Sequence, residues 1–255
     1  RTIEEGRLTP KVIITVDLFG LPANYPAIRK IADAHRLFIL EDGAQGFGGM
    51  IGNKRACSFG DISTTSFFPA KPLGCYGDGG AVFTDNDEWA ALADSYRVHG
   101  KGMFKYDNVR IGMNSRLDTL QAAILKIKFK AFREYELRDI NKAAALYTRL
   151  LAGRGKTPVT PEGYYSSWAQ YTICLNSREE RDALQACLKE QGIPSMVYYP
   201  TPMHGQTAYK ALNAPTDCCP TAKRLCDTVL SLPVHPYITE EEIETVCSVI
   251  LGFVR

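Results

Sequence analysis

The segment SFFPAKPLGCYGDGG, residues 66–80, places a single lysine, Lys71, between two prolines and follows it with four glycines. Proline and glycine set the local backbone strongly, so the conformation around this one amine is tightly defined. An amine beside Phe67, Phe68 and Leu73 would lose hydration, which favours its neutral, nucleophilic form. A glycine-rich surface turn carrying an incidental lysine explains the same residues equally well.

Short apolar runs surround this segment and alternate with helical patterns. The runs that we interpret as strands cover residues 12–16, 37–42, 61–68 and 79–85, and an amphipathic helix opened by proline covers 26–36. Such alternation is typical of strand-helix-strand units. The sequence therefore predicts an α/β fold built on a mainly parallel sheet flanked by helices.

The second half of the chain has a different pattern. Helical periodicity without proline or glycine runs from Ser115 to Gly153 and predicts one long helix or two abutting ones. Beyond it we expect strands at 171–175 and 193–199, a helix capped by Ser177 and a final helix capped by Thr239, which together form a smaller α+β domain. The expected domains are residues 1–115, a connecting helix at 116–153, and residues 154–255.

Composition narrows the class of protein. The net charge of +2 over 255 residues gives no electrostatic footprint for nucleic acid. No apolar run is long enough to span a membrane and no signal peptide opens the chain, so we expect a cytoplasmic protein. The eight cysteines lack C-x-x-C spacing, which predicts buried thiols and neither a metal site nor a disulfide framework. Because the chain opens without methionine and leads directly into a strand, we expect a fragment.

A second chemical feature is the segment LFILEDGAQGFGG, residues 37–49. An apolar strand that ends in two carboxylates places Asp42 at the carboxyl end of the sheet, where open α/β folds bind their ligands. An acid in this position also serves as a helix cap or a turn residue in many proteins. The segment by itself leaves both interpretations open.

Taken together and in order, these motifs resemble those of the DegT/DnrJ/StrS family of sugar aminotransferases. The resemblance runs through the whole chain and rests on EDGAQ (41–45), SFFPAKPLG (66–74), YGDGG (76–80), HG (99–100) and GMNSRLDTLQAAIL (112–125). It implies the fold-type-I architecture of pyridoxal-phosphate (PLP) transferases, with an incomplete large domain. It also implies a homodimer whose active sites are shared between the subunits.

The resemblance assigns roles around the cofactor ring. Lys71 matches the lysine that holds PLP as a Schiff base and later moves a proton between substrate and cofactor. Asp42 matches the carboxylate that keeps the pyridine nitrogen protonated, so that the ring can act as an electron sink. Gln45 matches the residue beside the phenolic oxygen, and the small Ala44 would let the ring lie close to the strand end.

The resemblance also assigns the phosphate site. Ser66 matches a hydroxyl that donates to the cofactor phosphate, and Asn114 matches a residue that reaches the phosphate from the neighbouring subunit. Family members carry a further segment before residue 12, with a helix start that binds the phosphate and an aromatic side chain that stacks on the ring. Because helix N-termini bind anions well, lack of that segment would weaken cofactor binding.

Substrate contacts are expected around the same cleft. The guanidinium of Arg116 suits a carboxylate or phosphate of a sugar nucleotide, although a salt bridge at the helix start explains it equally well. Relatives often carry histidine where Tyr198 stands, and His204 is as readily a structural histidine as a ligand. The candidate substrate residues are His99, Tyr106, Arg116, Tyr198, Tyr199 and His204.

These features predict an aminotransferase that moves an amino group from L-glutamate to a nucleotide-linked keto-sugar. The motifs at 112–125 and 198–204 look most like members acting at C3 of UDP-linked 2-acetamido sugars, in the synthesis of a surface polysaccharide or a secondary metabolite. One alternative is a sugar dehydratase, but relatives of that type replace the lysine with histidine. The other is a non-catalytic regulatory homologue, whose usual sign is loss of the lysine or the aspartate.

Overall fold

The computed structural model describes residues 2–213, 215 and 218–253. The chain divides into two compact units. The first unit comprises Arg1–Leu137 with Thr160–Ala169, and the second unit comprises Arg138–Val159 with Gln170–Arg255. Within the described residues, no helix combines the length and the apolar character needed to cross a membrane. The domain limits expected from the sequence stay a prediction.

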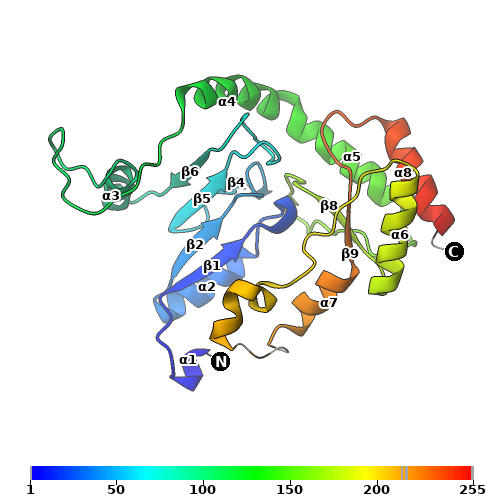
Figure 1. The fold of residues 1–255 in the computed structure, drawn as a ribbon, viewed down its shortest axis with the longest axis horizontal. Helices are drawn as coiled ribbons and strands as arrows, with labels where there is room; N and C mark the ends of the chain where they lie inside the picture. Colours follow the sequence, from blue (N-terminus) through cyan, green and yellow to red (C-terminus); the bar gives the residue numbers. More distant parts are fainter. Residues whose placement is uncertain (1, 214, 216–217, 254–255) are drawn as a thin grey trace. The chain divides into compact units, whose positions relative to one another are not determined.

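The first unit is built on a four-stranded sheet in the order β1-β2-β5-β6 (Figure 1). β1, β2 and β5 are parallel, and β6 is antiparallel to β5. The predicted, mainly parallel α/β sheet is therefore confirmed. The strands are β1 (Val12–Val16), β2 (Phe38–Asp42), β5 (Ile62–Ser66) and β6 (Gly80–Phe83).

Helix α2 (Tyr25–His35) connects β1 to β2. Its N-cap, Asn24, accepts a hydrogen bond from the backbone N–H of Ala27 through its side chain at 3.2 Å, and proline occupies the first turn as predicted. Tyr25 and Ala32 pack with Ile39 of β2 in a buried apolar cluster. This packing holds the helix against the sheet and fixes where each strand ends.

The remaining elements of the first unit are short or peripheral. β7 pairs with β3, so the segment at 160–169 becomes part of this unit. These elements are α1 (Thr2–Glu5), η1 (Leu18–Gly20), β3 (Met50–Ile51), β4 (Lys54–Arg55), α3 (Asp87–Arg97), α4 (Thr119–Ala131), η2 (Phe132–Glu136) and β7 (Tyr164–Tyr165).

The helical stretch expected from Ser115 to Gly153 is confirmed as three abutting segments. α4 passes into η2, which is a π-helical turn, and then into α5 (Leu137–Leu150). The π turn places Phe132 in a buried cluster of the first unit. Isolated π turns of this kind occur within α-helices and often lie near functional sites.

The second unit combines a two-stranded antiparallel sheet with helices. Its core is formed by large apolar side chains that are almost fully buried, among them Tyr147, Leu184, Leu230, Ile243 and Ile250. Its elements, besides α5, are β8 (Tyr171–Cys174), α6 (Arg178–Glu190), η3 (Met203–Gly205), η4 (Thr207–Leu212), α7 (Pro220–Thr228), β9 (Val229–Leu232) and α8 (Glu240–Phe253).

One expected strand of the second unit is wrong. Residues 193–199 form no strand; only Met196 makes a bridge, to Ser231 of β9. Pro194 lies within the run and Pro200 follows it, and proline cannot donate to a ladder of hydrogen bonds. The partner of β8 is instead β9, which the sequence analysis missed.

Candidate active site

Three polar residues follow or end the parallel strands of the first unit at one edge of the sheet. Asp17 comes directly after β1, Asp42 ends β2 and Ser66 ends β5. The backbone N–H of Asp17 donates to the carbonyl oxygen of Asp42 at 3.1 Å, and Ser66 lies opposite Gly80 at the start of β6. The carboxyl edge of a parallel sheet is where such folds bind ligands. The structure thus brings Asp42 and Ser66 to the expected edge.

Asp42 is half-buried, and its own loop orients it. Its Oδ1 atom accepts a hydrogen bond from the backbone N–H of Ala44 at 3.0 Å, which leaves Oδ2 for another partner. The next residue, Gly43, donates its N–H to the carbonyl oxygen of Thr64 at 2.8 Å. A Cβ on Gly43 would lie 2.5 Å from Sγ of Cys57, so only glycine fits here.

Glu41 is a buried carboxylate that holds a loop by hydrogen bonds, a role that the sequence did not predict. Its Oε2 atom accepts hydrogen bonds from the backbone N–H groups of Phe59 and Gly60, at 2.8 and 2.9 Å, and from the Ser63 hydroxyl at 2.8 Å. Its Oε1 atom accepts from the N–H of Cys57. Burial, followed by the charge of Glu41, raises the pKa of the Cys57 thiol to about 12. Successive side chains of a strand point to opposite faces of the sheet, so Glu41 points into the protein interior and Asp42 points to the other face.

Asp17 is the second carboxylate that the sequence analysis missed, although it follows a strand just as Asp42 does. It is fully buried, and its Oδ1 atom accepts hydrogen bonds from the Tyr25 hydroxyl at 2.7 Å and the Ala23 N–H at 3.0 Å. Its Oδ2 atom has no hydrogen-bond partner among the described residues. Burial raises its pKa from 3.8 to about 7, opposed by these hydrogen bonds and assisted by the charge of Glu41. A Cβ on Gly46 would lie 2.4 Å from Oδ2, so Asp17 packs directly against the loop that carries Gln45.

Gln45 lies in this loop with 7% of its surface exposed. Its Oε1 atom accepts a hydrogen bond from the backbone N–H of Phe19 at 2.7 Å, and its carbonyl oxygen accepts from the Ser167 hydroxyl at 2.7 Å. The bond to Phe19 sets which end of the amide is oxygen and therefore which end is the donor. The loop after β2 is thus held by segments on both sides of it in the sequence.

The turn that carries Lys71 is equally constrained. The backbone N–H of Lys71 donates to the carbonyl oxygen of Phe68 at 2.9 Å, and a Cβ on Gly74 would lie 2.5 Å from the carbonyl oxygen of Pro69. Lys71 is half-buried, and within the described part of the chain its amine has no ion pair or hydrogen bond. The Ser66 hydroxyl accepts from the Phe68 N–H at 3.2 Å, which leaves its own hydrogen for another acceptor.

One apolar cluster joins the loop of Asp42 to the turn of Lys71. Phe47, two residues after Gln45, packs edge-on against Phe67 with 6.1 Å between the ring centroids. Leu73, two residues after Lys71, is 4% exposed in the same cluster, whereas Phe68 is 50% exposed and does not shield the amine fully. The cluster also contains Cys75, Leu125 and Phe132. The structure therefore connects the two motifs through packing.

The segment from Val98 to Leu117, called the arm below, carries four of the candidate residues. Asn114 bridges to Val98 and accepts a hydrogen bond on Oδ1 from Nη2 of Arg116 at 2.6 Å. Arg116 makes no ion pair within the described residues, so the salt bridge considered as its alternative role is not formed there. His99 adopts a positive φ of 59°, and Tyr106 is 87% exposed.

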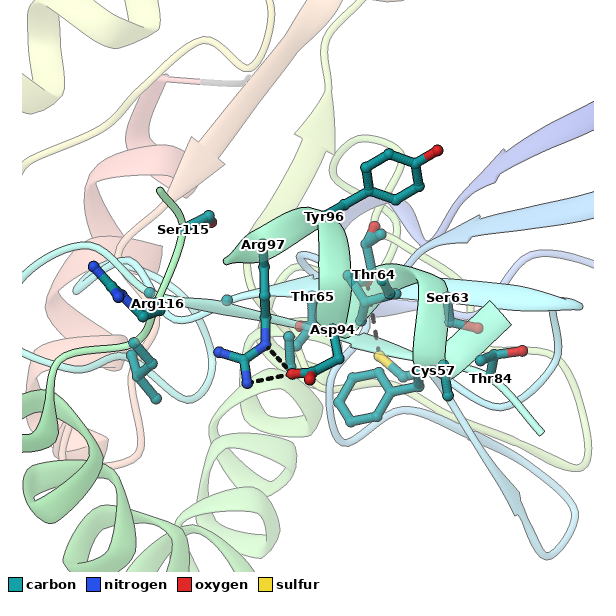
Figure 2. Close-up of a pocket in the computed structure, with 18 of the residues that line it drawn as sticks. Cys57, Ser63, Thr64, Thr65, Thr84, Asp94, Tyr96, Arg97, Ser115 and Arg116 are labelled. Atoms are coloured by element: carbon teal, nitrogen blue, oxygen red, sulfur yellow. Dashed lines mark hydrogen bonds and ion pairs between the residues drawn. The ribbon is translucent and has the colours of Figure 1, made fainter. Parts of the chain in front are cut away.

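A cavity of about 1310 Å³ lies against β5 and β6 (Figure 2). It is lined by β5, β6, α3 and the arm, and its wall includes Asn114 and Arg116. Asp94 and Arg97 of α3 form an ion pair at its rim. Neither Lys71 nor Asp42 is among the residues that line this cavity.

The other candidates belong to the second unit. Tyr198 is half-buried, and its ring centroid lies 5.5 Å from that of Tyr199, which is 48% exposed. His204 lines a cavity of about 300 Å³ together with Arg178 and Asp227. Arg178 and Asp227 form an ion pair with each other. The roles of these residues stay a prediction.

The sheet and its polar edge define a class of protein, the fold-type-I PLP transferases, and structural comparison supports this class. A solved DegT DnrJ EryC1 StrS aminotransferase from Brucella abortus matches with a TM-score of 0.93 and 48% identity, over 99% of this chain and 67% of that one. The sequence profile described as the DegT/DnrJ/EryC1/StrS aminotransferase family matches residues 1–251. The chain belongs to this family, whose aminotransferases use PLP.

Two curated relatives bear on the substrate. A Pseudomonas aeruginosa protein named UDP-2-acetamido-2-deoxy-3-oxo-D-glucuronate aminotransferase is 42% identical over 247 residues, which cover 96% of this chain and 67% of that protein. A Geobacillus stearothermophilus protein named pleiotropic regulatory protein is 43% identical over 249 residues, which cover 96% and 66%. This chain therefore spans about two thirds of the length of these relatives.

Proposed function

We propose that this protein transfers an amino group from L-glutamate to a nucleotide-linked keto-sugar with the help of PLP. The observation that carries the proposal is the packing of Phe47 against Phe67, which joins the loop of Asp42 to the turn of Lys71. This packing connects the loop that follows Asp42, whose Oδ1 accepts from Ala44, to the turn that carries Lys71, whose amine has no ion pair among the described residues.

The donors and acceptors at the sheet edge fit PLP. When bound, PLP supplies an electron sink for the bond rearrangements of transamination. Asp42 would hold a proton on the pyridine nitrogen, and Ser66 would donate to the phosphate with the hydrogen that its bond to Phe68 leaves unused. Gln45, with its Oε1 fixed by Phe19, would present its nitrogen as a donor to the phenolic oxygen.

Lys71 is the proposed base. With PLP bound, its amine would move a proton between the substrate carbon and the cofactor carbon, a task that requires a neutral amine close to both atoms. The close turn at Gly74 and the buried side chain of Leu73 hold the backbone of Lys71 in place, while the half-exposed Phe68 lets solvent reach part of the turn.

For the substrate we propose a UDP-linked 2-acetamido sugar with a ketone at C3. The printed name of the Pseudomonas aeruginosa relative specifies a sugar of this type. The amino sugar formed would serve a surface polysaccharide or a secondary metabolite. His99, Tyr106, Arg116, Tyr198, Tyr199 and His204 remain proposed substrate contacts, and the cytoplasm remains the proposed compartment.

We also propose a homodimer with a shared active site. Large apolar side chains of the arm are strongly exposed: Met103 at 92%, Phe104 at 75% and Ile111 at 95%. Exposed apolar patches mark interaction sites in soluble proteins. A second copy covering the arm would bury them and would let Asn114, on the wall of the cavity beside β5 and β6, reach the cofactor phosphate of the partner.

A regulatory role is the second candidate, because the Geobacillus stearothermophilus relative is named as a regulatory protein. Both Lys71 and Asp42 are present here, which favours the enzyme. Only the enzyme would convert a keto-sugar, so measuring this conversion distinguishes the two functions. A sugar dehydratase, the other alternative, is disfavoured by Lys71.

A single-turnover assay tests the proposal. The protein is loaded with pyridoxamine phosphate and mixed with a panel of nucleotide-linked keto-sugars. Conversion of the pyridoxamine spectrum to the pyridoxal spectrum is expected fastest with a UDP-linked 3-keto-2-acetamido sugar. Conversion with none of the sugars, in a protein that holds the cofactor, would favour the regulatory role.

A further inference from the structure

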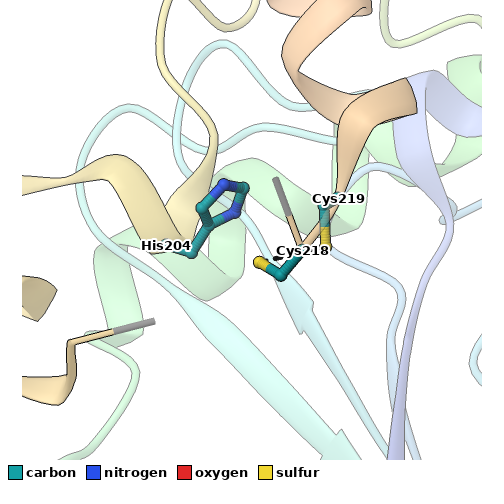
Figure 3. Close-up of side chains that lie close together, drawn as sticks. All are labelled: His204, Cys218 and Cys219. Atoms are coloured by element: carbon teal, nitrogen blue, oxygen red, sulfur yellow. Dashed lines mark hydrogen bonds between the residues drawn. The ribbon is translucent and has the colours of Figure 1, made fainter. Parts of the chain in front are cut away.

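The second unit brings one histidine and two adjacent cysteines together at its surface (Figure 3). Among the described residues, the ligand atoms of His204, Cys218 and Cys219 all lie within 4.8 Å of one another. Both cysteines are exposed thiols, and His204 is half-buried. The sequence analysis expected buried cysteines and no metal site, because it searched for C-x-x-C spacing rather than for neighbours in space.

The distances within this group suit a tetrahedral metal ion. A zinc–sulfur bond of about 2.3 Å and a tetrahedral angle place two thiolate sulfurs about 3.8 Å apart. The Sγ atoms of Cys218 and Cys219 are 3.8 Å apart. A zinc–nitrogen bond of about 2.0–2.1 Å places the imidazole nitrogen about 3.5 Å from each sulfur. The imidazole nitrogen of His204 lies within 4.8 Å of both sulfurs, so zinc binding requires it to move closer by at most about 1.3 Å.

The type of ligand selects the metal. Two thiolates and one imidazole form a soft donor set, which prefers zinc or copper(I) to magnesium, calcium or manganese. Three protein ligands leave a fourth tetrahedral position, and the exposure of both cysteines lets water fill it. Of the group, Cys219 is also the N-cap of α7, where unpaired backbone N–H groups favour a negative charge such as a metal-bound thiolate.

We propose that His204, Cys218 and Cys219 form a binding site for Zn²⁺. On binding, each thiol releases its proton to solvent and a zinc–sulfur bond forms in its place, while the neutral imidazole donates a lone pair; nothing is oxidised or reduced. The ion ties η3, which carries His204, to the start of α7. With zinc bound, the role of His204 in the second unit is structural and replaces the substrate contact proposed above.

Cobalt substitution tests the site, because tetrahedral Co²⁺ bound to thiolate absorbs in the visible range and shows a sulfur-to-metal charge-transfer band. The purified protein, reduced and free of metal, is titrated with Co²⁺ and then with Zn²⁺. We expect one equivalent of Co²⁺ to give both absorptions and Zn²⁺ to displace it. Loss of an outer-shell partner costs about 10- to 100-fold in metal affinity. Loss of a direct ligand in Cys218→Ser or Cys219→Ser should therefore cost at least about 100-fold.

Matched variants separate this site from general thiol chemistry. Cys187→Ser, in α6, and His235→Ala, at an exposed histidine of the same unit, should leave the titration unchanged. His204→Ala should weaken binding and shift the visible absorption while the second unit stays folded by circular dichroism. A charge-transfer band that survives in Cys218→Ser and Cys219→Ser would overturn the proposal. So would binding that needs both cysteines but is unaffected by His204→Ala.

Discussion

The sheet edge and the arm differ in how the chain supports them. At the sheet edge, Glu41 and Gln45 are buried, and backbone and side-chain hydrogen bonds hold both of them. In the arm, Tyr106 and Ile111 are 87% and 95% exposed. Both regions carry residues assigned to one active site. The arm has backbone hydrogen bonds of its own, such as those from Met113 to Tyr96 at 2.7 Å and from Ser115 to Arg97 at 2.9 Å, but its large apolar side chains are not buried by the chain.

The two regions therefore differ in how much of the site the chain itself buries. Residues that hold the cofactor ring stand on strand ends fixed by buried contacts, which keeps catalytic geometry precise. The exposed apolar side chains of the arm would instead be buried against a partner surface. The predictions below test whether the sheet edge is self-supporting and whether the arm depends on association.

The largest expected effect follows removal of the Glu41 carboxylate. Glu41→Ala would leave the N–H groups of Phe59 and Gly60 and the Ser63 hydroxyl without their hydrogen-bond acceptor. We expect the free energy of unfolding to fall by about 3 kcal/mol or more. Tryptophan fluorescence reports on this unit selectively, because the only two tryptophans, Trp89 and Trp168, both belong to it. The exposed Glu162→Ala is the control and should stay near wild type. An equal, small effect of both substitutions would show that the edge does not depend on Glu41.

Asp42→Asn should reduce transamination by about 100-fold or more, because an amide cannot keep the pyridine nitrogen protonated. The amide Oδ1 retains the hydrogen bond from Ala44, so folding should change little. Single-turnover rates and thermal unfolding are measured on the same preparation. Full activity in the folded variant would remove Asp42 from the proposed role.

Asp17 makes the stability of the first unit depend on pH. Its pKa is raised from 3.8 to about 7, so the folded state favours the protonated form. Its contribution is fully present below about pH 4 and is lost as the pH rises through about 7. Asp17→Asn keeps an oxygen for the Tyr25 hydroxyl and does not titrate. The stability of wild type minus that of the variant should fall between pH 4 and 8, and a flat difference would contradict the assignment.

The smallest effect on folding is expected in the arm. Ile111→Asp should change the free energy of unfolding by less than about 0.5 kcal/mol, as is usual for an exposed position. It should nevertheless weaken the proposed homodimer, since a charge would enter an apolar interface. Sedimentation analysis compares it with Val159→Asp, an equally simple change at a site that is 78% exposed in the second unit. Identical association of both variants would exclude the arm from the interface.

The sequence predicted local features better than spatial ones. The strand end at Asp42 and the caps Ser177 and Thr239 were predicted from short patterns, and the structure confirms them, whereas the strand predicted over 61–68 ends two residues earlier, at Ser66. Contacts between segments far apart in the sequence have no short pattern. The hydrogen bonds from residues 57–63 to the buried Glu41 carboxylate were therefore not predicted. The run 193–199 has residues that favour strands, but it pairs with β9 only at Met196, since Pro194 within the run lacks an N–H to donate.

Covalent attachment of PLP to Lys71 is the most direct test of the account. The protein is incubated with PLP, reduced with borohydride, digested and analysed by mass spectrometry, with Lys71→Ala and the arm substitution Lys105→Ala treated in parallel. The account predicts a borohydride-sensitive absorbance band and one modified peptide containing Lys71, both lost in Lys71→Ala and both kept in Lys105→Ala. A band that persists in Lys71→Ala, or modification at another lysine, would contradict it.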